Sequence, residues 1–130
     1  MYASKATLSF LTEYYDAIEA NDRERIARYY TDDIALTFAN NPIIHGRETL
    51  LDTFTQILDR VQSLHHDVLN AYEEDDGVLI VETMGTWNLK DERHISVRAI
   101  DIFTAIEGCF AKHVMVVDNG PLFSALAEQA

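Results

Sequence analysis

The chain has 130 residues, of which 48% are hydrophobic, so residues 1–130 can form one domain with its own core. Ten lysines and arginines against 22 aspartates and glutamates give a net charge of −12, a field that disfavours nucleic acid and anionic membranes as partners. The single Cys109 excludes an internal disulfide, and no segment is long and apolar enough to cross a bilayer, so we expect a cytoplasmic protein.

The N-terminal 30 residues show the spacing of two amphipathic helices. Apolar side chains recur at steps of three and four from Ser4 to about Asn21. Asn21 or Asp22 can cap a second, short helix, whose inner face would carry Ile26 and Tyr30. We therefore expect two helices at the start of the chain.

The next segment combines one strand with one helix. Alternation from Ile34 to Phe38 predicts a strand, and the sequence ANNP that follows is typical of a turn. After Gly46, apolar residues from Leu50 to Val61 fall on one face of a third helix. The predicted order is helix, helix, strand, helix.

The second half of the chain is rich in β-branched and aromatic residues separated by turn signals. It predicts four strands with hairpin connections, at about 62–73, 78–89, 93–106 and 109–118. A closing turn or short helix would carry Phe123 and Leu126. No internal repeat or linker divides the chain, which again indicates one domain.

This order of elements indicates an α+β fold with a curved antiparallel β-sheet, in which the three helices of the N-terminal half cover the concave face. Apolar side chains are too many for one face of such a sheet; they include Ile80, Val81, Trp87, Ile100 and Ile102. We therefore expect the convex face to pack against a second copy of the chain in a homodimer.

Three segments resemble a known family: EYYDAIEANDRERIARYYTDDIAL at 13–36, HGRETLLDTF at 45–54 and VRAIDIFTAIEGCFAKHVMVVD at 97–118. They resemble the ketosteroid isomerase and SnoaL-like polyketide cyclase branch of the nuclear transport factor 2-like superfamily. The resemblance implies a cone-shaped fold with a pocket for a small apolar ligand and without a cofactor. Because that fold hosts isomerases, cyclases, epoxide hydrolases, dehydratases and plain binding modules, it does not select a reaction.

The resemblance implies two hydrogen-bond donors in the pocket for the carbonyl oxygen of a ligand. Tyr14 falls where ketosteroid isomerases keep the tyrosine that donates to the developing enolate oxygen, and Asp101 where they keep a protonated aspartic acid. Ala99 and Phe103 flank Asp101 at even spacing, so a carboxyl group facing the pocket would have apolar surroundings. Arg98 is the alternative, structural partner of Asp101, although a separation of three positions puts the two on opposite strand faces.

The usual bases of the family are missing. The carboxylate at the end of the first strand aligns with Phe38, and the aspartate of the last strand aligns with Met115. His113 shares the face of Met115 and is the best replacement base, with His66 as the second candidate. For both histidines, and for Tyr14, the alternative is a side chain that only packs in the wall of the core.

A metal site is not expected. His65 and His66 are adjacent, so on a strand their side chains point to opposite faces and cannot share one ion without a bulge. By alternation, His66 shares a face with Leu64, Val68 and Tyr72, and one of the two histidines could meet His113 across the sheet.

Two hypotheses about function remain open. The first is an isomerase-like or cyclase-like enzyme that transfers a proton on an apolar carbonyl compound. The second is a non-catalytic ligand-binding or dimerisation domain, which Phe38 and Met115 favour. In either case we expect the same residues to line the pocket: Leu36, Phe38, Phe54, Ala99, Phe103 and Met115.

Overall fold

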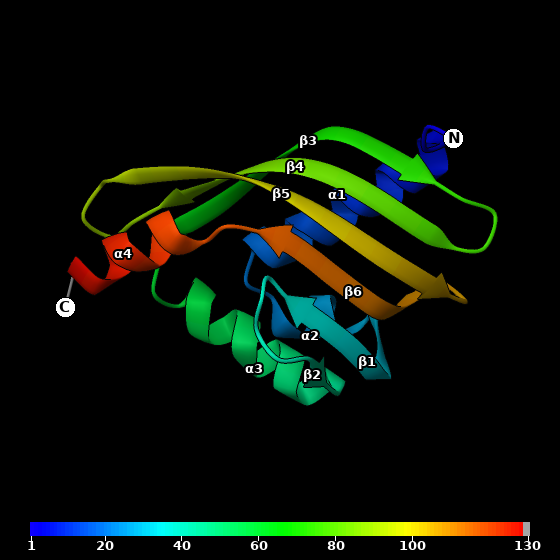
Figure 1. Ribbon diagram of the computed structural model, residues 1–130, viewed down its shortest axis with the longest axis horizontal. Helices are drawn as coiled ribbons and strands as arrows, with labels where there is room; N and C mark the ends of the chain where they lie inside the picture. The colour runs from blue at the N-terminus through cyan, green and yellow to red at the C-terminus, as the bar shows by residue number, and fades with distance from the viewer. Residues whose placement is uncertain (129–130) are drawn as a thin grey trace.

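A computed structural model describes residues 1–128 of the chain as four helices and six strands. In chain order these are α1 (Lys5–Glu19), α2 (Arg23–Ala27), β1 (Tyr30–Phe38), β2 (Ile44–His45), α3 (Arg47–Leu58), β3 (Ser63–Glu73), β4 (Val78–Asn88), β5 (His94–Ile106), β6 (Cys109–Val117) and α4 (Gly120–Glu128). The strands form one curved, unclosed sheet in the order β2-β1-β6-β5-β4-β3 (Figure 1). The α+β fold expected from the sequence is confirmed.

Local capping explains where the first helices begin. The Ser4 hydroxyl accepts a hydrogen bond from the Thr7 backbone N–H and starts α1, and the Asp22 carboxylate accepts from the Arg25 backbone N–H and starts α2. Between them, Asn21 adopts a φ of 50°, a left-handed conformation that asparagine tolerates better than most residues. Both predicted helices are confirmed.

The position expected for Tyr30 is wrong. Tyr30 does not lie on the inner face of α2, which ends at Ala27, but is the first residue of β1. The Phe110 backbone N–H donates to the Tyr29 carbonyl at 2.6 Å, and Tyr30 pairs with Phe110 in the sheet. This contact between distant segments replaces the local helical hydrogen bonds, so β1 begins four residues before the predicted strand at Ile34.

Strands β3 to β6 form the predicted antiparallel meander, but β1 joins it in another way. It lies parallel to β6, with Leu36 opposite His113 and Phe38 opposite Met115. The two-residue strand β2 pairs antiparallel with the outer edge of β1 and was not predicted. Parallel pairing joins segments far apart in the chain, and alternation within one strand carries no signal for it.

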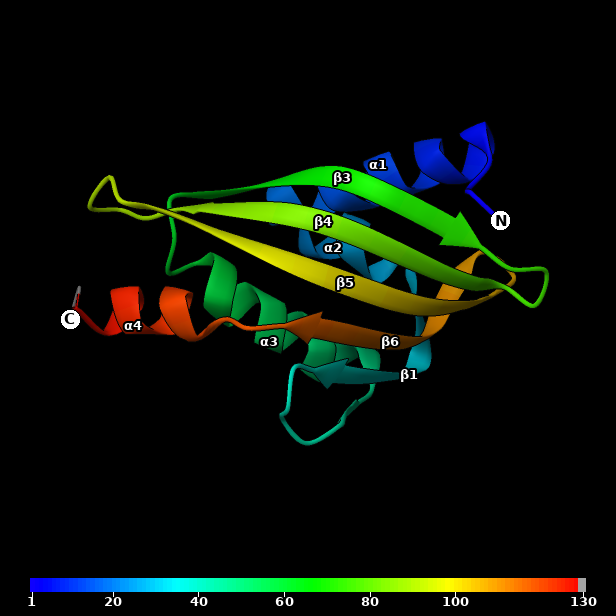
Figure 2. The same ribbon diagram turned by 45° about the horizontal axis from the view of Figure 1, so that its top comes forward.

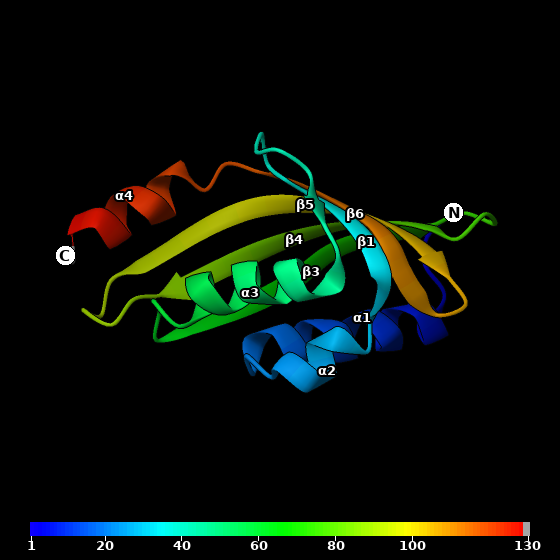
Figure 3. The ribbon, with the colours of Figure 1, turned by 90° about the horizontal axis from the view of Figure 1, so that it is seen from below.

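The two faces of the sheet differ in what covers them. Helices α1, α2 and α3 lie on one side of the sheet (Figure 3), and β3 to β6 present the other side without a helix over it (Figure 2). This arrangement agrees with the expected coverage of the concave face. On the uncovered face, Ile80, Ile100 and Val116 are exposed, whereas Val81 is buried on the helical side.

A register shift in β3 corrects one prediction from alternation. The pairing of β3 with β4 shifts between Val68 and Asn70. Before the shift, Leu64, His66 and Val68 pair with Trp87, Gly85 and Thr83, so Val68 shares the face of His66 as expected, although it is partly exposed. After the shift Ala71 is the buried residue, while Tyr72 pairs with Ile80 and is exposed. The extra residue reverses the side chain direction, so Tyr72 does not share the face of His66.

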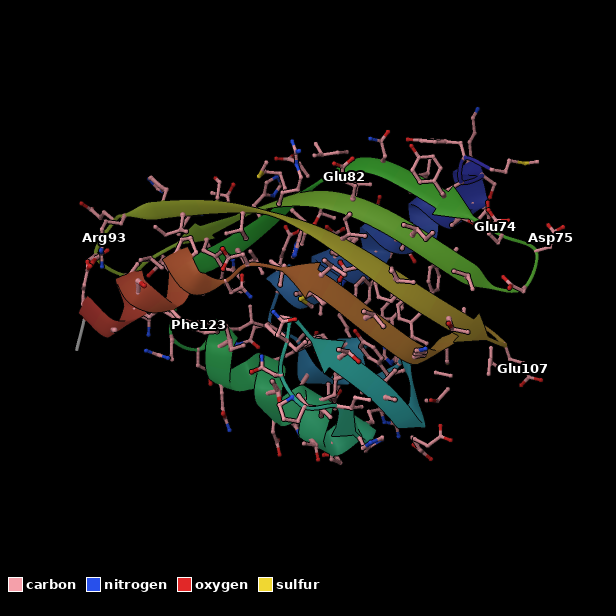
Figure 4. The ribbon with its side chains drawn as sticks, in the orientation of Figure 1. Glu74, Asp75, Glu82, Arg93, Glu107 and Phe123 are labelled. Atoms are coloured by element: carbon pink, nitrogen blue, oxygen red, sulfur yellow. The ribbon has the colours of Figure 1, made fainter. Side chains whose placement is uncertain are left out.

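The closing helix α4 packs at the end of the β4–β5 hairpin. Leu122 and Leu126 form a small buried cluster with Val61 and Leu89, as expected of an amphipathic closing element. Arg93, at the hairpin tip in Figure 4, donates to the Ala125 carbonyl at 2.8 Å. Within residues 1–128, no helix has both the length and the hydropathy needed to span a membrane.

Candidate functional site

A cavity of about 80 Å³ lies between the concave face of the sheet and helices α1 and α3, several times the ~10–15 Å³ that one water molecule needs. Most of its wall is apolar. The lining residues are Tyr14, Tyr15, Ile18, Phe38, Phe54, Ile57, Leu58, Leu64, His66, Thr83, Gly85, Trp87, Val97, Ala99, Asp101, Met115, Val117 and Asn119. A few polar groups therefore converge on an apolar space, as in a typical small-molecule site.

Asp101 lies at the inner end of this pocket, on β5 and between Val81 of β4 and Met115 of β6. Its carboxylate accepts the Tyr15 hydroxyl hydrogen at 2.7 Å through Oδ2, and the His113 Nε2–H at 2.8 Å through Oδ1. The alternative partner, Arg98, instead approaches Glu82, with 3.6 Å between Nε and Oε2. Asp101 is thus buried and held by two side chains.

His113 continues this contact into a chain of hydrogen bonds. Its Nδ1 lies 3.1 Å from the Tyr30 hydroxyl, which in turn lies 2.5 Å from the Tyr14 hydroxyl. With a neutral imidazole every donor has an acceptor: Tyr14 donates to Tyr30, Tyr30 to Nδ1, and Nε2–H to Asp101. His113 does not line the pocket itself, but lies behind Asp101.

The buried tyrosines Tyr14 and Tyr15 of this hydrogen-bonded group stay protonated at neutral pH. Burial, and then the neighbouring Tyr30 and Asp101, hold the pKa of Tyr14 well above its ordinary value. Burial and the adjacent Asp101 carboxylate do the same to the pKa of Tyr15. The phenols therefore act as O–H donors, and the Asp101 carboxylate accepts one of these hydrogen bonds, from Tyr15.

A second carboxylate–histidine pair reaches the pocket from α1 and β3. His66 lines the pocket, and its Nδ1 lies 3.1 Å from Oε2 of Glu19, which also accepts the His66 backbone N–H at 3.1 Å. Burial alone would raise the pKa of Glu19, but these hydrogen bonds outweigh it and lower the pKa. The His66 ring also packs on the Tyr15 ring, with 4.6 Å between their centres.

The predicted site residues occupy different positions in this arrangement. Tyr14, Asp101 and His66 line the pocket, and His113 supports Asp101 from behind. Tyr14 does not donate to Asp101, because Tyr15 occupies that place. His66 and His113 do not meet across the sheet, since β4 and β5 separate their strands.

The expected wall of the pocket is largely present. Phe38, Phe54, Ala99 and Met115 line the cavity, whereas Leu36 and Phe103 are absent from the lining and belong to the core. Among residues 1–128, no three His, Cys, Asp or Glu side chains are arranged as ligands of a metal ion.

Sequence reasoning missed three residues of the two networks. Tyr15 and Glu19 lie four positions apart on α1 and so face the same side of the helix, a spacing that could have linked them. Tyr30 was assigned to a helix, and its partners His113 and Tyr14 come from other elements. Nothing local in the sequence connects Tyr30 with His113 and Tyr14.

Several solved structures share this fold at low sequence identity. A protein named as a SnoaL-like polyketide cyclase from Jannaschia sp. CCS1 is 16% identical, with a TM-score of 0.79 over 98% of this chain and 97% of that one. An LEH-like epoxide hydrolase from M. tuberculosis is 12% identical, with a TM-score of 0.74 over 92% and 88% of the two chains. A ketosteroid isomerase-like protein from Catenulispora acidiphila DSM 44928, in complex with trimethylamine, is 13% identical, with a TM-score of 0.72 over 82% of each chain.

Sequence comparison with curated proteins finds no match. The family model of the SnoaL-like domain, however, matches residues 11–113, a span that contains Tyr14, His66, Asp101 and His113. Because this span covers most of the sequence, the chain belongs to the SnoaL-like domain family.

Proposed function

We propose that this protein binds a small, largely apolar ketone in the pocket and moves a proton at the carbon next to the carbonyl group, with Asp101 as the base. One observation carries the proposal: the Asp101 carboxylate lines an apolar cavity while Tyr15 and His113 hold it in place. A carboxylate in such surroundings is costly to bury, which makes it a candidate functional group.

The chemical step needs no further reactant. An Asp101 oxygen takes a proton from the carbon, the C–H bond breaks, and its electron pair moves toward the carbonyl oxygen to give an enolate. The same carboxyl group then returns the proton to that carbon or to another carbon within reach. Tyr15 and His113 position the carboxylate through their hydrogen bonds to its two oxygens.

His66 supplies a second proton-exchanging group on the pocket wall. Glu19 holds its Nδ1, so the ring presents its other edge to the cavity, where Nε2 has no hydrogen bond to residues 1–128. A protonated His66 can donate through Nε2 to the enolate oxygen, and a neutral one can accept a proton from a ligand hydroxyl. We therefore propose that His66 exchanges a proton with the carbonyl oxygen of the ligand.

The proposed roles of Asp101 and Tyr14 differ from those that the family resemblance implied. Asp101 was expected to be a protonated donor, but its two donor partners support a carboxylate that accepts. Tyr14 was expected to donate to the enolate, but its hydroxyl is engaged with Tyr30. The proposed base therefore lies on β5 rather than at the aligned positions Phe38 and Met115.

A ligand-binding protein without catalysis is the second candidate. Phe38 and Met115 favour it, because both are apolar pocket residues where the family resemblance implies acids. The names of the structural relatives do not decide the matter, since they include a polyketide cyclase and an epoxide hydrolase on one fold.

Exchange of α-hydrogens for deuterium separates these candidates. With 4-phenylcyclohexanone in D₂O, followed by NMR, we expect saturable exchange above the buffer rate. Gly85→Leu should abolish it, because a Cβ at Gly85 lies 3.8 Å from the Leu64 side chain and the longer chain would fill the pocket. Thr86→Leu, on the opposite face of β4, is the control. Binding without exchange by the unmodified protein would favour the non-catalytic candidate.

We also propose that the uncovered sheet face pairs with a second copy of the chain. Ile80, Ile100 and Val116 are exposed there. Although the chain carries a net charge of −12, Glu82 on this face is paired with Arg98, so two copies can approach without strong repulsion. Sedimentation should show a dimer for the unmodified protein and a monomer for Ile80→Glu/Ile100→Glu; a monomer in both cases would refute the pairing.

A further inference from the structure

Two polar atoms of the pocket wall have no role in the networks described above. The Oγ1 of Thr83 and the Oδ1 of Asn119 are buried and have no hydrogen bond partner within residues 1–128. Thr83 is 1% exposed and Asn119 is 7% exposed, and both line the cavity that contains Asp101. Buried polar atoms are nearly always paired in folded proteins, so two exceptions in one cavity point to groups of a ligand.

The strand register orders these atoms along the pocket. Thr83 is opposite Ala99, two residues along β5 from Asp101, which corresponds to about 7 Å. Val117 is opposite Ala99 on the other side of β5, and Asn119 follows two residues later, about 13 Å from the level of Asp101. Thr83 is therefore close to the proposed base, and Asn119 lies toward the other end of the cavity.

Packing and capping do not explain the two side chains. Thr83 alternates with Val81 and Gly85 on the inner side of β4, where valine would have the same shape without a buried hydroxyl. Asn119 precedes α4, but it is its backbone carbonyl that accepts the Phe123 N–H, while its side chain oxygen is turned into the pocket wall. Asn119 also lies outside the matched span 11–113, so it is a feature of this chain beyond the family model.

We propose that the ligand is an elongated two-ring ketone with a hydroxyl group at the end remote from its carbonyl. The Thr83 hydroxyl donates to the carbonyl oxygen, and Asn119 Oδ1 accepts the remote hydroxyl hydrogen. The two backbone positions are separated by two strand spacings and a two-residue rise, about 12 Å, which fits two rings in line rather than one. The assignment of the carbonyl end rests on the proposed function, whereas the two-point recognition itself does not.

A pair of probes that differ by one hydroxyl group tests this inference. We would measure by calorimetry the binding of 4-(4-hydroxyphenyl)cyclohexanone and of 4-phenylcyclohexanone. The unmodified protein should bind the hydroxylated probe about tenfold more tightly, as expected for one buried hydrogen bond. Asn119→Ala should remove this preference, and Asn119→Asp, which keeps an acceptor, should retain it. Asn40→Ala, at an exposed turn, is the matched control.

Thr83→Val should weaken the binding of both probes by a similar factor of about ten, and Thr83→Ser should restore it. Equal affinities of the two probes for the unmodified protein, or a preference that survives in Asn119→Ala, would overturn the inference, as would the failure of both probes to bind. Tight binding with the expected preference but without α-hydrogen exchange would refute only the proposed proton transfer.

Thermal unfolding distinguishes this role from a structural one. A hydroxyl that stabilises the fold leaves the protein with a lower Tm when it is removed. Thr83→Val should instead leave the Tm unchanged or higher, because Oγ1 has no partner to lose. A clear drop in the Tm of Thr83→Val would show that the hydroxyl serves the fold and would overturn its assignment to a ligand.

Discussion

The pocket contains two carboxylate–histidine pairs that are built in opposite order. In the Asp101–His113 pair, joined at 2.8 Å, the carboxylate lines the cavity and the imidazole lies behind it. In the Glu19–His66 pair, joined at 3.1 Å, the imidazole lines the cavity and the carboxylate lies behind it. Each pair thus presents one group to the pocket: the Asp101 carboxylate, which accepts from the Tyr15 hydroxyl, and the His66 imidazole, which packs on the Tyr15 ring.

Burial also differs between the pairs. The side chains of Asp101 and His113 are 6% and 1% exposed, whereas those of Glu19 and His66 are 21% and 14% exposed. Solvent therefore reaches the Glu19–His66 pair more easily than the Asp101–His113 pair. This difference agrees with the proposal that Asp101 acts on the carbon of the ligand and that His66 exchanges a proton with its oxygen.

The largest expected effect is the cost of breaking the buried pair. Asp101→Ala leaves His113 and Tyr15 buried without their acceptor, and it should lower the free energy of unfolding by about 2–5 kcal/mol, because each buried unpaired donor costs about 1–3 kcal/mol. Glu19→Ala should cost clearly less, because solvent can reach its partner. Urea unfolding at pH 7 measures both. Equal losses would contradict the contrast in burial.

A medium effect should appear in the rate of exchange. Tyr15 donates to the Asp101 carboxylate, so Tyr15→Phe removes one of the two side chains that position the proposed base. The exchange rate of 4-phenylcyclohexanone at saturation should fall by about tenfold. Tyr29→Phe is the matched control, since its ring is only partly buried next to Tyr14. An unchanged exchange rate in Tyr15→Phe would contradict the positioning role of Tyr15.

The smallest expected effect concerns the pH dependence of stability. The pKa of Glu19 is lower in the folded protein than its ordinary value of 4.5, so the folded state binds this proton less readily than the unfolded state. The stabilisation by Glu19 is therefore complete above about pH 4.5 and is lost as the pH falls through the lowered folded pKa. The difference in unfolding free energy between the unmodified protein and Glu19→Gln should shrink over that range. A difference independent of pH would contradict the role of the ionised carboxylate.

The sequence allowed the fold to be predicted better than the site. Apolar periodicity located α1 and α3, and alternation located β3 to β6, because these signals are local. Alternation failed where β3 shifts register after Val68, and it could not show that β1 lies parallel to β6. Both depend on pairing between segments, which a single strand does not encode.

At the site, Asp101 was predictable because a carboxylate within an apolar strand is conspicuous in the sequence. Its partners were not, because Tyr15 and His113 reach it across 86 and 12 positions of the chain. Thr83 was unremarkable for a different reason: threonine is a common strand residue, and only its buried, unpaired hydroxyl sets it apart.

The central claim is that Asp101 removes a proton from a ligand in the pocket. The most direct test measures the exchange rate of 4-phenylcyclohexanone at saturation, together with its Kd, in Asp101→Asn. Asp75→Asn, in the exposed β3–β4 turn shown in Figure 4, is the control. We predict that Asp101→Asn loses exchange by about 100-fold or more while its Kd changes by no more than about threefold. Exchange that persists near the unmodified rate in Asp101→Asn would contradict the claim.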